Sequence, residues 1–203
     1  MSEQLDRAKL KEVVCWVVNS VGPEALGQTK LHKVLYYAEM LTFLATGRPL
    51  TGAIFRKRPY GPTCDALLGI QDELSKEGCL EVTRQNYYGY KKTTFALLGR
   101  FSPTLISADE ISLLRDVVEF VCLRNSAVTI SEFSHDIVWQ MVEFGEDIPY
   151  HSALNLVPNE ETEDALSWGM SVAKEIEDAR PIRAADLEGR PPRALRAAML
   201  DRH

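Results

Sequence analysis

Histidines beside carboxylates are the residues of this chain with the clearest potential for chemistry. His135 is followed directly by Asp136, and His151 is the other histidine that a nearby carboxylate could assist. An imidazole paired with a carboxylate can exchange a proton near neutral pH, which general acid–base catalysis requires. A helical histidine that bonds to backbone or packs on Trp139 accounts for His135 without catalysis, and we favour this interpretation.

Other catalytic and metal-binding patterns are missing from the sequence. It contains no phosphate-binding glycine loop, no Gly-x-Ser-x-Gly elbow, no His-Glu-x-x-His and no Cys-x-x-Cys. The cysteines Cys15, Cys64, Cys79 and Cys122 are spaced for neither a disulfide framework nor a zinc site. We therefore expect a protein that is not an enzyme and needs no cofactor or metal, and we keep an unrecognised hydrolase as the third alternative.

Charge is distributed unevenly along the chain. The formal net charge is −6, but residues 179–203 carry six arginines and three carboxylates, a balance of +3 that leaves −9 for the rest. An acidic body with a basic tail favours a basic partner for the body or an acidic partner for the tail. The negative net charge disfavours contact with phosphate backbones, which require clustered lysine and arginine. The polar N-terminus and the lack of an 18-residue apolar run predict a cytoplasmic protein without membrane contact.

Helices dominate the predicted architecture. Residues 4–20 and 29–46 have apolar residues at helical spacing, and the second stretch is apolar almost all the way round, which is typical of a core helix. Thr29 can cap its start, and Gly47 supplies the left-handed residue that ends many helices. An exposed helix that binds a partner is the alternative for this stretch.

A strand, a turn and a hairpin follow the second helix. Residues 53–58 predict a strand, residues 60–62 a turn, and residues 62–77 a helix opened by the proline. Residues 80–85 and 93–98 are rich in β-formers and predict a hairpin. We expect the hairpin and the first strand to form a three-stranded sheet.

Capping signals predict the remaining helices. Residues 107–124 and 129–143 each begin with a Ser/Thr-x-x-Glu capping box and then show apolar residues at helical spacing. Residues 145–158 predict a loop, and residues 161–177 predict a last helix with an acidic first turn.

The fold class that these elements predict is α+β and mainly α: a compact helical domain with a small antiparallel β-sheet or hairpin. We place this domain in residues 1–178 and a basic, flexible tail in residues 179–203, where prolines flank the arginines. Apolar residues alternate with arginine near the end, so the tail could fold as an amphipathic helix on a partner. A disordered tail without function is equally consistent with this composition.

Several short motifs together resemble one protein family. The matching residues, in chain order, are Lys30, Leu31, Lys33, Leu35, Tyr36, Tyr37 and Ala38, then Gly47, Pro49 and Leu50, then Tyr60, Gly61 and Pro62, and finally Ser134, His135, Trp139 and Ile148. In order and spacing the chain resembles the Panacea-domain proteins, the SocA-like antitoxins of bacterial toxin–antitoxin systems. Two features depart from that pattern: His32 stands where we expect glutamine, and His135 and Trp139 are closer in sequence than expected.

The resemblance implies an antitoxin that is encoded with a toxin and neutralises it by stoichiometric binding, either by blocking the toxin or by delivering it to a protease. Such a protein needs no cofactor, and its partners are the cognate toxin and, in the second mode, a cellular protease. The family-motif or partner-binding candidates that it implies are Lys33, Tyr36, Tyr60, Gly61, Pro62, His135 and Trp139.

The predicted hairpin adds candidates of its own. Tyr87, Tyr88 and Tyr90 lie in the segment that joins the two strands, and tyrosine is enriched among the residues that dominate protein interfaces. Tyrosines that merely line a mobile loop are the alternative.

A winged-helix DNA-binding regulator is the alternative function. Helices followed by a hairpin have the required order, and Lys91, Lys92 and the basic residues 56–58 could contact phosphate. The helix predicted for residues 62–77 is acidic, which opposes contact with phosphate. Its carboxylates are Asp65, Asp72, Glu73 and Glu77. We therefore do not expect nucleic acid as a partner.

Overall fold

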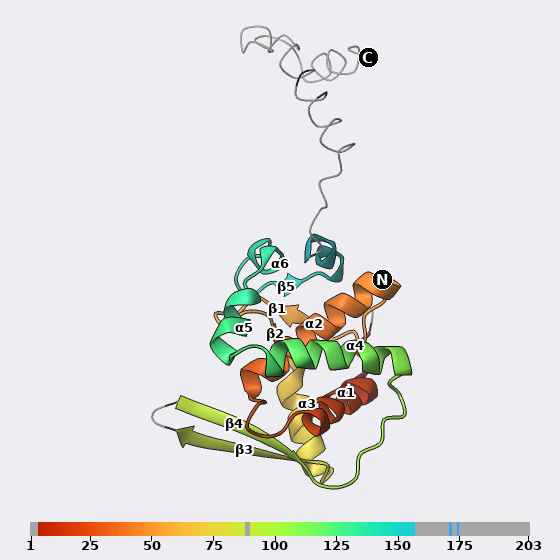
Figure 1. Cartoon of the computed structure of the whole chain (residues 1–203), viewed down its shortest axis with the longest axis vertical. Coiled ribbons are helices and arrows are strands. Elements are labelled where there is room, and N and C mark those ends of the chain that lie inside the picture. The colour runs from red at the N-terminus through yellow and green to blue at the C-terminus, as the bar shows by residue number, and fades with distance from the viewer. Residues whose placement is uncertain (1–3, 88–89, 157–170, 172–173, 175–203) are drawn as a thin grey trace. The chain divides into compact units, whose positions relative to one another are not determined.

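The computed structural model describes residues 4–87 and 90–156 and the two further positions 171 and 174 (Figure 1). Its helices are α1 (Arg7–Ser20), α2 (Gln28–Thr46), α3 (Ala66–Lys76), α4 (Ala108–Val118), the π-helical turn η1 (Glu119–Leu123), α5 (Ala127–Phe133), α6 (Ile137–Gln140) and the 3-10 helix η2 (Tyr150–Leu156). Its strands are β1 (Phe55–Arg56), β2 (Thr63–Cys64), β3 (Leu80–Tyr87), β4 (Tyr90–Leu97) and β5 (Asp147–Ile148). The predicted class, mainly helical α+β, is confirmed.

The chain divides into two units, residues 1–158 and residues 159–203, and the elements above belong to the first. Apart from positions 171 and 174, the predicted helix at 161–177 and the tail at 179–203 lie outside the described residues. The domain boundary at residue 178 therefore stays a prediction. Among the described residues, the structure contains no helix with the length and apolar character of a membrane span.

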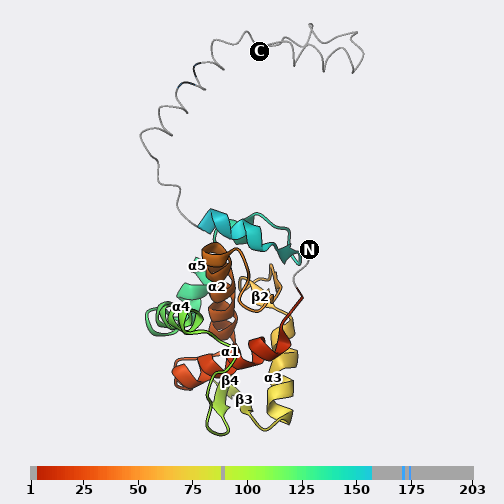
Figure 2. The same cartoon turned by 90° about the vertical axis from the view of Figure 1, so that its right-hand side faces the viewer.

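Helix α2 is the central helix of the first unit, as its sequence predicts. Figures 1 and 2 show it running through the middle, with α1 and α3 toward one end and α4 alongside. The side chains of Leu31, Val34 and Leu35 are at most 1% exposed. Leu41 and Ala45 continue the same helical spacing, which predicts burial, but both are exposed. The last turns of α2 therefore contact the core on one side only.

The sheets differ from the predicted arrangement. β3 and β4 form the expected antiparallel hairpin along their whole length. β1 does not join this hairpin, because Phe55 lies between Cys64 of β2 and Ile148 of β5 in a separate antiparallel sheet. The expected three-stranded sheet of residues 53–58 with the hairpin is wrong. Its true partner strands are two residues long, too short to show the alternation that marks a strand in sequence.

Two predicted helix starts are also wrong. Thr29 does not cap α2, since Gly27 occupies the N-cap with extended backbone and no side-chain hydrogen bond. Pro62 does not open α3, because β2 pairs with β1 before the helix begins at Ala66. The loop predicted for residues 145–158 contains β5 and η2.

The two predicted capping boxes have different outcomes. Ser107 and Glu110 form the reciprocal capping box of α4, as expected, and the helix continues into η1. The single helix expected for residues 129–143 is wrong, because two short helices replace it. Ser126 caps α5 and Asp136 caps α6, each through its side chain.

Candidate functional site

The structure brings together the seven residues that the family resemblance nominated. Lys33 and Tyr36 come from α2, residues 60–62 form the turn between β1 and β2, and His135 and Trp139 come from the segment of α5 and α6. Hydrogen bonds, a ring stack and the close packing at Gly61 link these residues to three others. We name the whole set the turn clamp: Lys33, Tyr36, Tyr60, Gly61, Pro62, Ser131, Ser134, His135, Asp136 and Trp139.

Lys33 is the central residue of the turn clamp. It is only 1% exposed, and its amine Nζ donates to the carbonyl oxygens of Tyr60 at 2.6 Å and Pro62 at 3.1 Å. Burial lowers the pKa of Lys33 to about 7, and the nearby carboxylate of Asp136 opposes this effect only in part. Both the charged and the neutral amine have N–H groups for two carbonyls, so these bonds persist in either state.

Gly61 lets the amine approach the turn closely. Its φ is +88°, in the left-handed region that favours glycine. A β-carbon at this position would overlap with Oγ of Ser134 and Nζ of Lys33. Ser131 of α5 adds a second donor to the carbonyl of Tyr60, at 3.1 Å. Side chains from both α2 and α5 therefore fix the position of the turn.

Asp136 links Tyr36 to the cap of α6. Its Oδ2 accepts a long hydrogen bond of 3.4 Å from the hydroxyl of Tyr36, and its Oδ1 accepts from the backbone N–H of Trp139 at 2.9 Å. Burial raises the pKa of Asp136, and the bond from Trp139 opposes this rise. The sequence marked Asp136 only as a carboxylate beside His135. The signal for its actual role is an aspartate placed to bond the N–H three residues later, as N-cap residues do.

His135 and Trp139 form a ring stack, so the expected packing of His135 on Trp139 is present, but His135 lies in the bend between α5 and α6 and not in a helix. Their ring centroids lie 4.2 Å apart with an angle of 27° between the planes. Nζ of Lys57 lies 4.2 Å from the Trp139 ring centroid, and the indole N–H donates to the carbonyl of Arg58 at 3.3 Å. A cation over an indole ring is attracted by its negative face. The stack thus fixes α6 to the strand that leads into the turn.

Replacing Lys33 with methionine tests the clamp through stability and its pH dependence. At about pH 8 we expect the Lys33→Met variant to lose about 1–3 kcal/mol of unfolding free energy, because the buried carbonyl of Pro62 loses its donor. Between the folded pKa of about 7 and the unfolded value of 10.5, the unfolded chain holds the extra proton on this amine. Wild-type stability should therefore rise with pH in this window, by at most about 1.4 kcal/mol per unit relative to the variant.

Urea unfolding of wild type and Lys33→Met between about pH 6 and pH 9 measures both effects. The difference between the two proteins should be smallest below the folded pKa, where the amine is protonated in both states. Stability curves that run parallel throughout this range would show that Lys33 does not titrate there, and would contradict the prediction.

Two further polar side chains of α2, the buried Glu39 and the partly buried His32, connect this helix to other segments. Glu39 is 1% exposed and accepts from the backbone N–H of Thr51 at 3.0 Å, from the hydroxyl of Thr51, and from the hydroxyl of Tyr150 at 3.3 Å. Burial raises the pKa of Glu39, and these bonds oppose the rise. Nδ1 of His32 accepts from the backbone N–H of Cys64 at 3.2 Å, and burial lowers its pKa to about 4. His32 is therefore neutral at pH 7 and has a structural role.

The hairpin tyrosines are not part of the turn clamp. Figure 1 shows the hairpin projecting from the end of the first unit opposite to α6. Tyr87 and Tyr90 are paired in the backbone register of β3 and β4, and Tyr88 lies outside the described residues. A role of these residues in partner binding stays a prediction.

Ion pairs occupy three of the basic residues that supported the DNA-binding alternative, namely Arg56, Arg58 and Lys92. Arg56 pairs with Asp65 at 2.8 Å and with Asp147 at 2.6 Å, and Arg58 lies 3.5 Å from Asp65. Lys57 lies over the indole ring of the turn clamp. Phosphate would have to displace these carboxylates, which disfavours this edge as a nucleic-acid surface.

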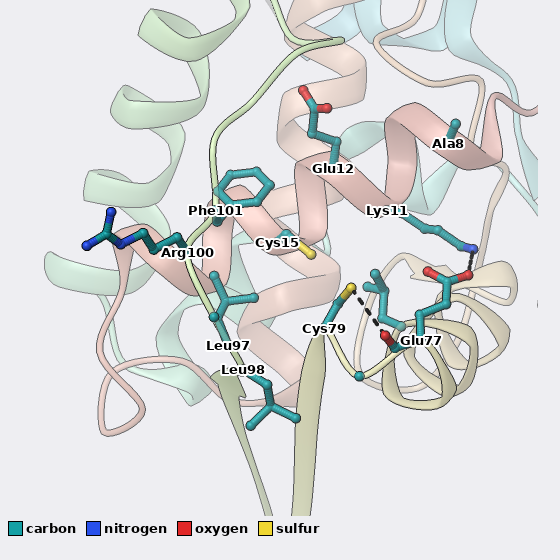
Figure 3. Close-up of a pocket in the computed structure, with 13 residues that line it drawn as sticks. Ala8, Lys11, Glu12, Cys15, Glu77, Cys79, Leu97, Leu98, Arg100 and Phe101 are labelled. Atoms are coloured by element: carbon teal, nitrogen blue, oxygen red, sulfur yellow. Dashed lines mark hydrogen bonds and ion pairs between the residues drawn. The ribbon is translucent and has the colours of Figure 1, made fainter.

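A pocket of about 300 Å³ lies between α1, the end of α3 and the end of β4 (Figure 3). Figure 3 shows the thiols of Cys15 and Cys79 directed into it, and the amine of Lys11 paired with Glu77 at 2.5 Å. Burial raises the pKa of Cys15 to about 11, which makes its thiol a poor nucleophile. In the described part of the chain, no group of three or more His, Cys, Asp or Glu residues could hold a metal ion. We assign no chemistry to this pocket.

The structure is a mainly helical α+β fold in which the turn clamp holds the turn of residues 60–62 by side-chain hydrogen bonds. The family model for the SocA-like antitoxin, Panacea domain, matches residues 31–140, more than half of the chain. The chain therefore belongs to the SocA-like antitoxin family, and the matched span contains the turn clamp from Lys33 to Trp139. Searches of the curated proteins and of the solved structures found no match to it.

Proposed function

We propose that this protein is a cytoplasmic antitoxin that neutralises a partner toxin by direct binding, without catalysis. The observation that carries the proposal is the exposure of Tyr60, which is 75% exposed although its backbone carbonyl is held by Lys33 and Ser131. The motif residues of an antitoxin family thus fix the backbone of a turn that presents an aromatic side chain to solvent. Rigidly held aromatic residues are frequent anchors of protein interfaces.

The polar groups of the turn clamp support binding rather than catalysis. The amine of Lys33 donates to two backbone carbonyls, Asp136 caps α6, and His135 stacks on Trp139. Catalytic groups converge on a cavity in which a substrate atom can lie. These groups converge on the backbone of the protein itself, so their effect is to position a surface.

Co-expression is the direct test of the proposal. The protein encoded by the reading frame adjacent to this gene should arrest growth when it is expressed alone and become harmless when both proteins are present. A neighbour that is harmless alone would contradict the proposal.

Blocking of the toxin and its delivery to a protease both begin with this binding step. The half-life of the toxin distinguishes the two modes. Delivery shortens the half-life when this protein is present, whereas blocking leaves it unchanged or lengthens it.

Replacing Tyr60 with alanine tests the proposed anchor. We expect the Tyr60→Ala variant to bind the toxin about tenfold more weakly or worse, as hot-spot substitutions do. Its stability should stay within about 0.5 kcal/mol of wild type because the side chain is exposed. Calorimetric titration and thermal melting provide the two measurements, and Ile54→Ala, at a residue that is 53% exposed, is the control. Equal affinities of wild type and Tyr60→Ala would exclude Tyr60 as an anchor.

A further inference from the structure

Exposed apolar side chains gather in one stretch of the chain. Half of the exposed large hydrophobic residues in the described part of the molecule lie between Phe120 and Phe144. We name this set the apolar segment: Phe120, Leu123, Val128, Phe133, Ile137, Met141 and Phe144, with exposed fractions from 39% to 69%. Such a concentration on a soluble domain marks an interaction surface.

Part of the apolar segment borders a groove. The ring of Phe120 lies 6.2 Å from that of Phe133 and 5.8 Å from that of Tyr37, measured between centroids. A groove of about 680 Å³ opens beside the rings of Tyr37 and Phe120, and its lining also includes Leu41 and Asp116. The groove offers an apolar side chain of a partner a place to insert.

The apolar segment also reaches the turn clamp. Ile137 and Met141 are one helical turn apart, so they project from the same face of α6. Ser131 of α5 bonds the carbonyl of Tyr60, and Figure 1 shows α5 and α6 at the same side of the first unit. The exposed Tyr60 therefore lies beside α5, and α5 belongs to the stretch of chain that carries the apolar segment.

The same stretch is strongly acidic. Residues 119–147 contain six carboxylates and one guanidinium, a formal net charge of −5, compared with −6 for the whole chain. Glu119 pairs with Arg124, and Asp147 pairs with Arg56. The exposed carboxylates of the stretch with no ion pair to another described residue are Glu132, Glu143 and Glu146.

We infer that the apolar segment, together with the groove and Tyr60, is the docking surface for a toxin face that combines lysine or arginine with large apolar side chains. This inference rests on the proposed function. The negative charge of this stretch indicates which partner binds here. A second copy of the acidic stretch or an anionic membrane would be repelled, whereas a basic protein face is attracted. Burial of the apolar side chains stabilises the complex, and the carboxylates accelerate encounter.

Matched double variants of the full chain test the apolar part of this surface. Ile137→Ser with Met141→Ser removes apolar side chains that are 51% and 58% exposed. Ile54→Ser with Leu68→Ser changes two that are 53% exposed and lie outside the segment. With the protein encoded by the adjacent reading frame as the probe, we expect the first pair to weaken affinity about 30-fold or more and the second by less than about threefold.

Charge reversal tests the acidic part. Glu132→Lys with Glu143→Lys should slow association at low salt about tenfold and remove most of its salt dependence. Asp72→Lys with Glu81→Lys produces the same net charge at exposed positions elsewhere, and should leave association close to wild type. Thermal melting of each variant identifies any that loses its fold. If the variant with Ile137→Ser and Met141→Ser is unfolded, the variant with Glu132→Lys and Glu143→Lys still tests the docking surface.

The outcomes separate the inference from the proposed function. If wild type binds the toxin and all four double variants bind equally well, the docking surface is wrong while the antitoxin function stands. If wild type does not bind, both fail. If sedimentation shows a wild-type dimer that Ile137→Ser with Met141→Ser dissociates, the occupant is a second copy and the inference is overturned.

Discussion

The Gly61→Ala variant should lose about 3 kcal/mol of unfolding free energy, because strain and overpacking of about 1–3 kcal/mol each combine at this position. The strain arises because the backbone at this position has a φ of +88°, which residues other than glycine rarely adopt. The overpacking arises because the new β-carbon overlaps with Oγ of Ser134 and Nζ of Lys33, both of which are buried. Relief requires Lys33 to withdraw from the carbonyls of the turn.

Gly78 provides the matched control for this substitution. Its φ is +71°, but a β-carbon there would meet no atom within 4 Å. Gly78→Ala should therefore show the strain alone, about 1 kcal/mol. Urea unfolding of both variants and wild type gives the comparison. A Gly61→Ala variant no less stable than Gly78→Ala would contradict the close packing of Lys33 and Ser134 against the turn.

The sequence predicted the parts of the fold that local patterns determine. The apolar character of residues 29–46 predicted the core helix, and Ser107 with Glu110 predicted the start of α4, because each signal involves neighbours in the chain. The lysine at position 33 within this apolar stretch is a signal that the sequence predictions did not use. A charged group in a helix without a polar face needs partners inside the protein.

The contacts that build the turn clamp could not be predicted from local patterns. The bond from Lys33 to Tyr60 spans 27 residues, and that from Tyr36 to Asp136 spans 100. Family resemblance nominated most members of the cluster, but neither spacing nor periodicity indicates which atoms meet. The same reason explains the wrong sheet, since β1 pairs with β2, directly after the turn, and with β5, near the end of the described chain.

The break between α5 and α6 explains why the apolar segment was missed. A single helix over residues 129–143 would place its apolar residues on one buried face. Side-chain caps at Ser126 and Asp136 form two short helices instead. Ile130 and Val138 are buried, whereas Phe133 and Ile137 are more than half exposed. Within each of the two helices the apolar residues keep helical spacing, but the chain changes direction at the break between α5 and α6.

Replacing Tyr36 with alanine should have the largest effect on stability, a loss of about 3–5 kcal/mol, as for other fully buried aromatic residues. Tyr36 is 0% exposed. Its ring centroid lies 5.6 Å from that of Phe55 and 5.2 Å from that of Tyr37, so truncation leaves a cavity between α2 and β1. The cavity cannot close without moving α2, the helix that carries Lys33.

Tyr36→Phe isolates the contribution of the hydroxyl. That group makes one long hydrogen bond of 3.4 Å, to Asp136, so its loss should cost about 1 kcal/mol. Thermal and urea unfolding of wild type and the two variants give both differences. A Tyr36→Phe variant as unstable as Tyr36→Ala would show that the bond to Asp136, not ring packing, holds the clamp to α2. Because Lys33 still holds the turn, Tyr36→Phe should bind the toxin with the affinity of wild type.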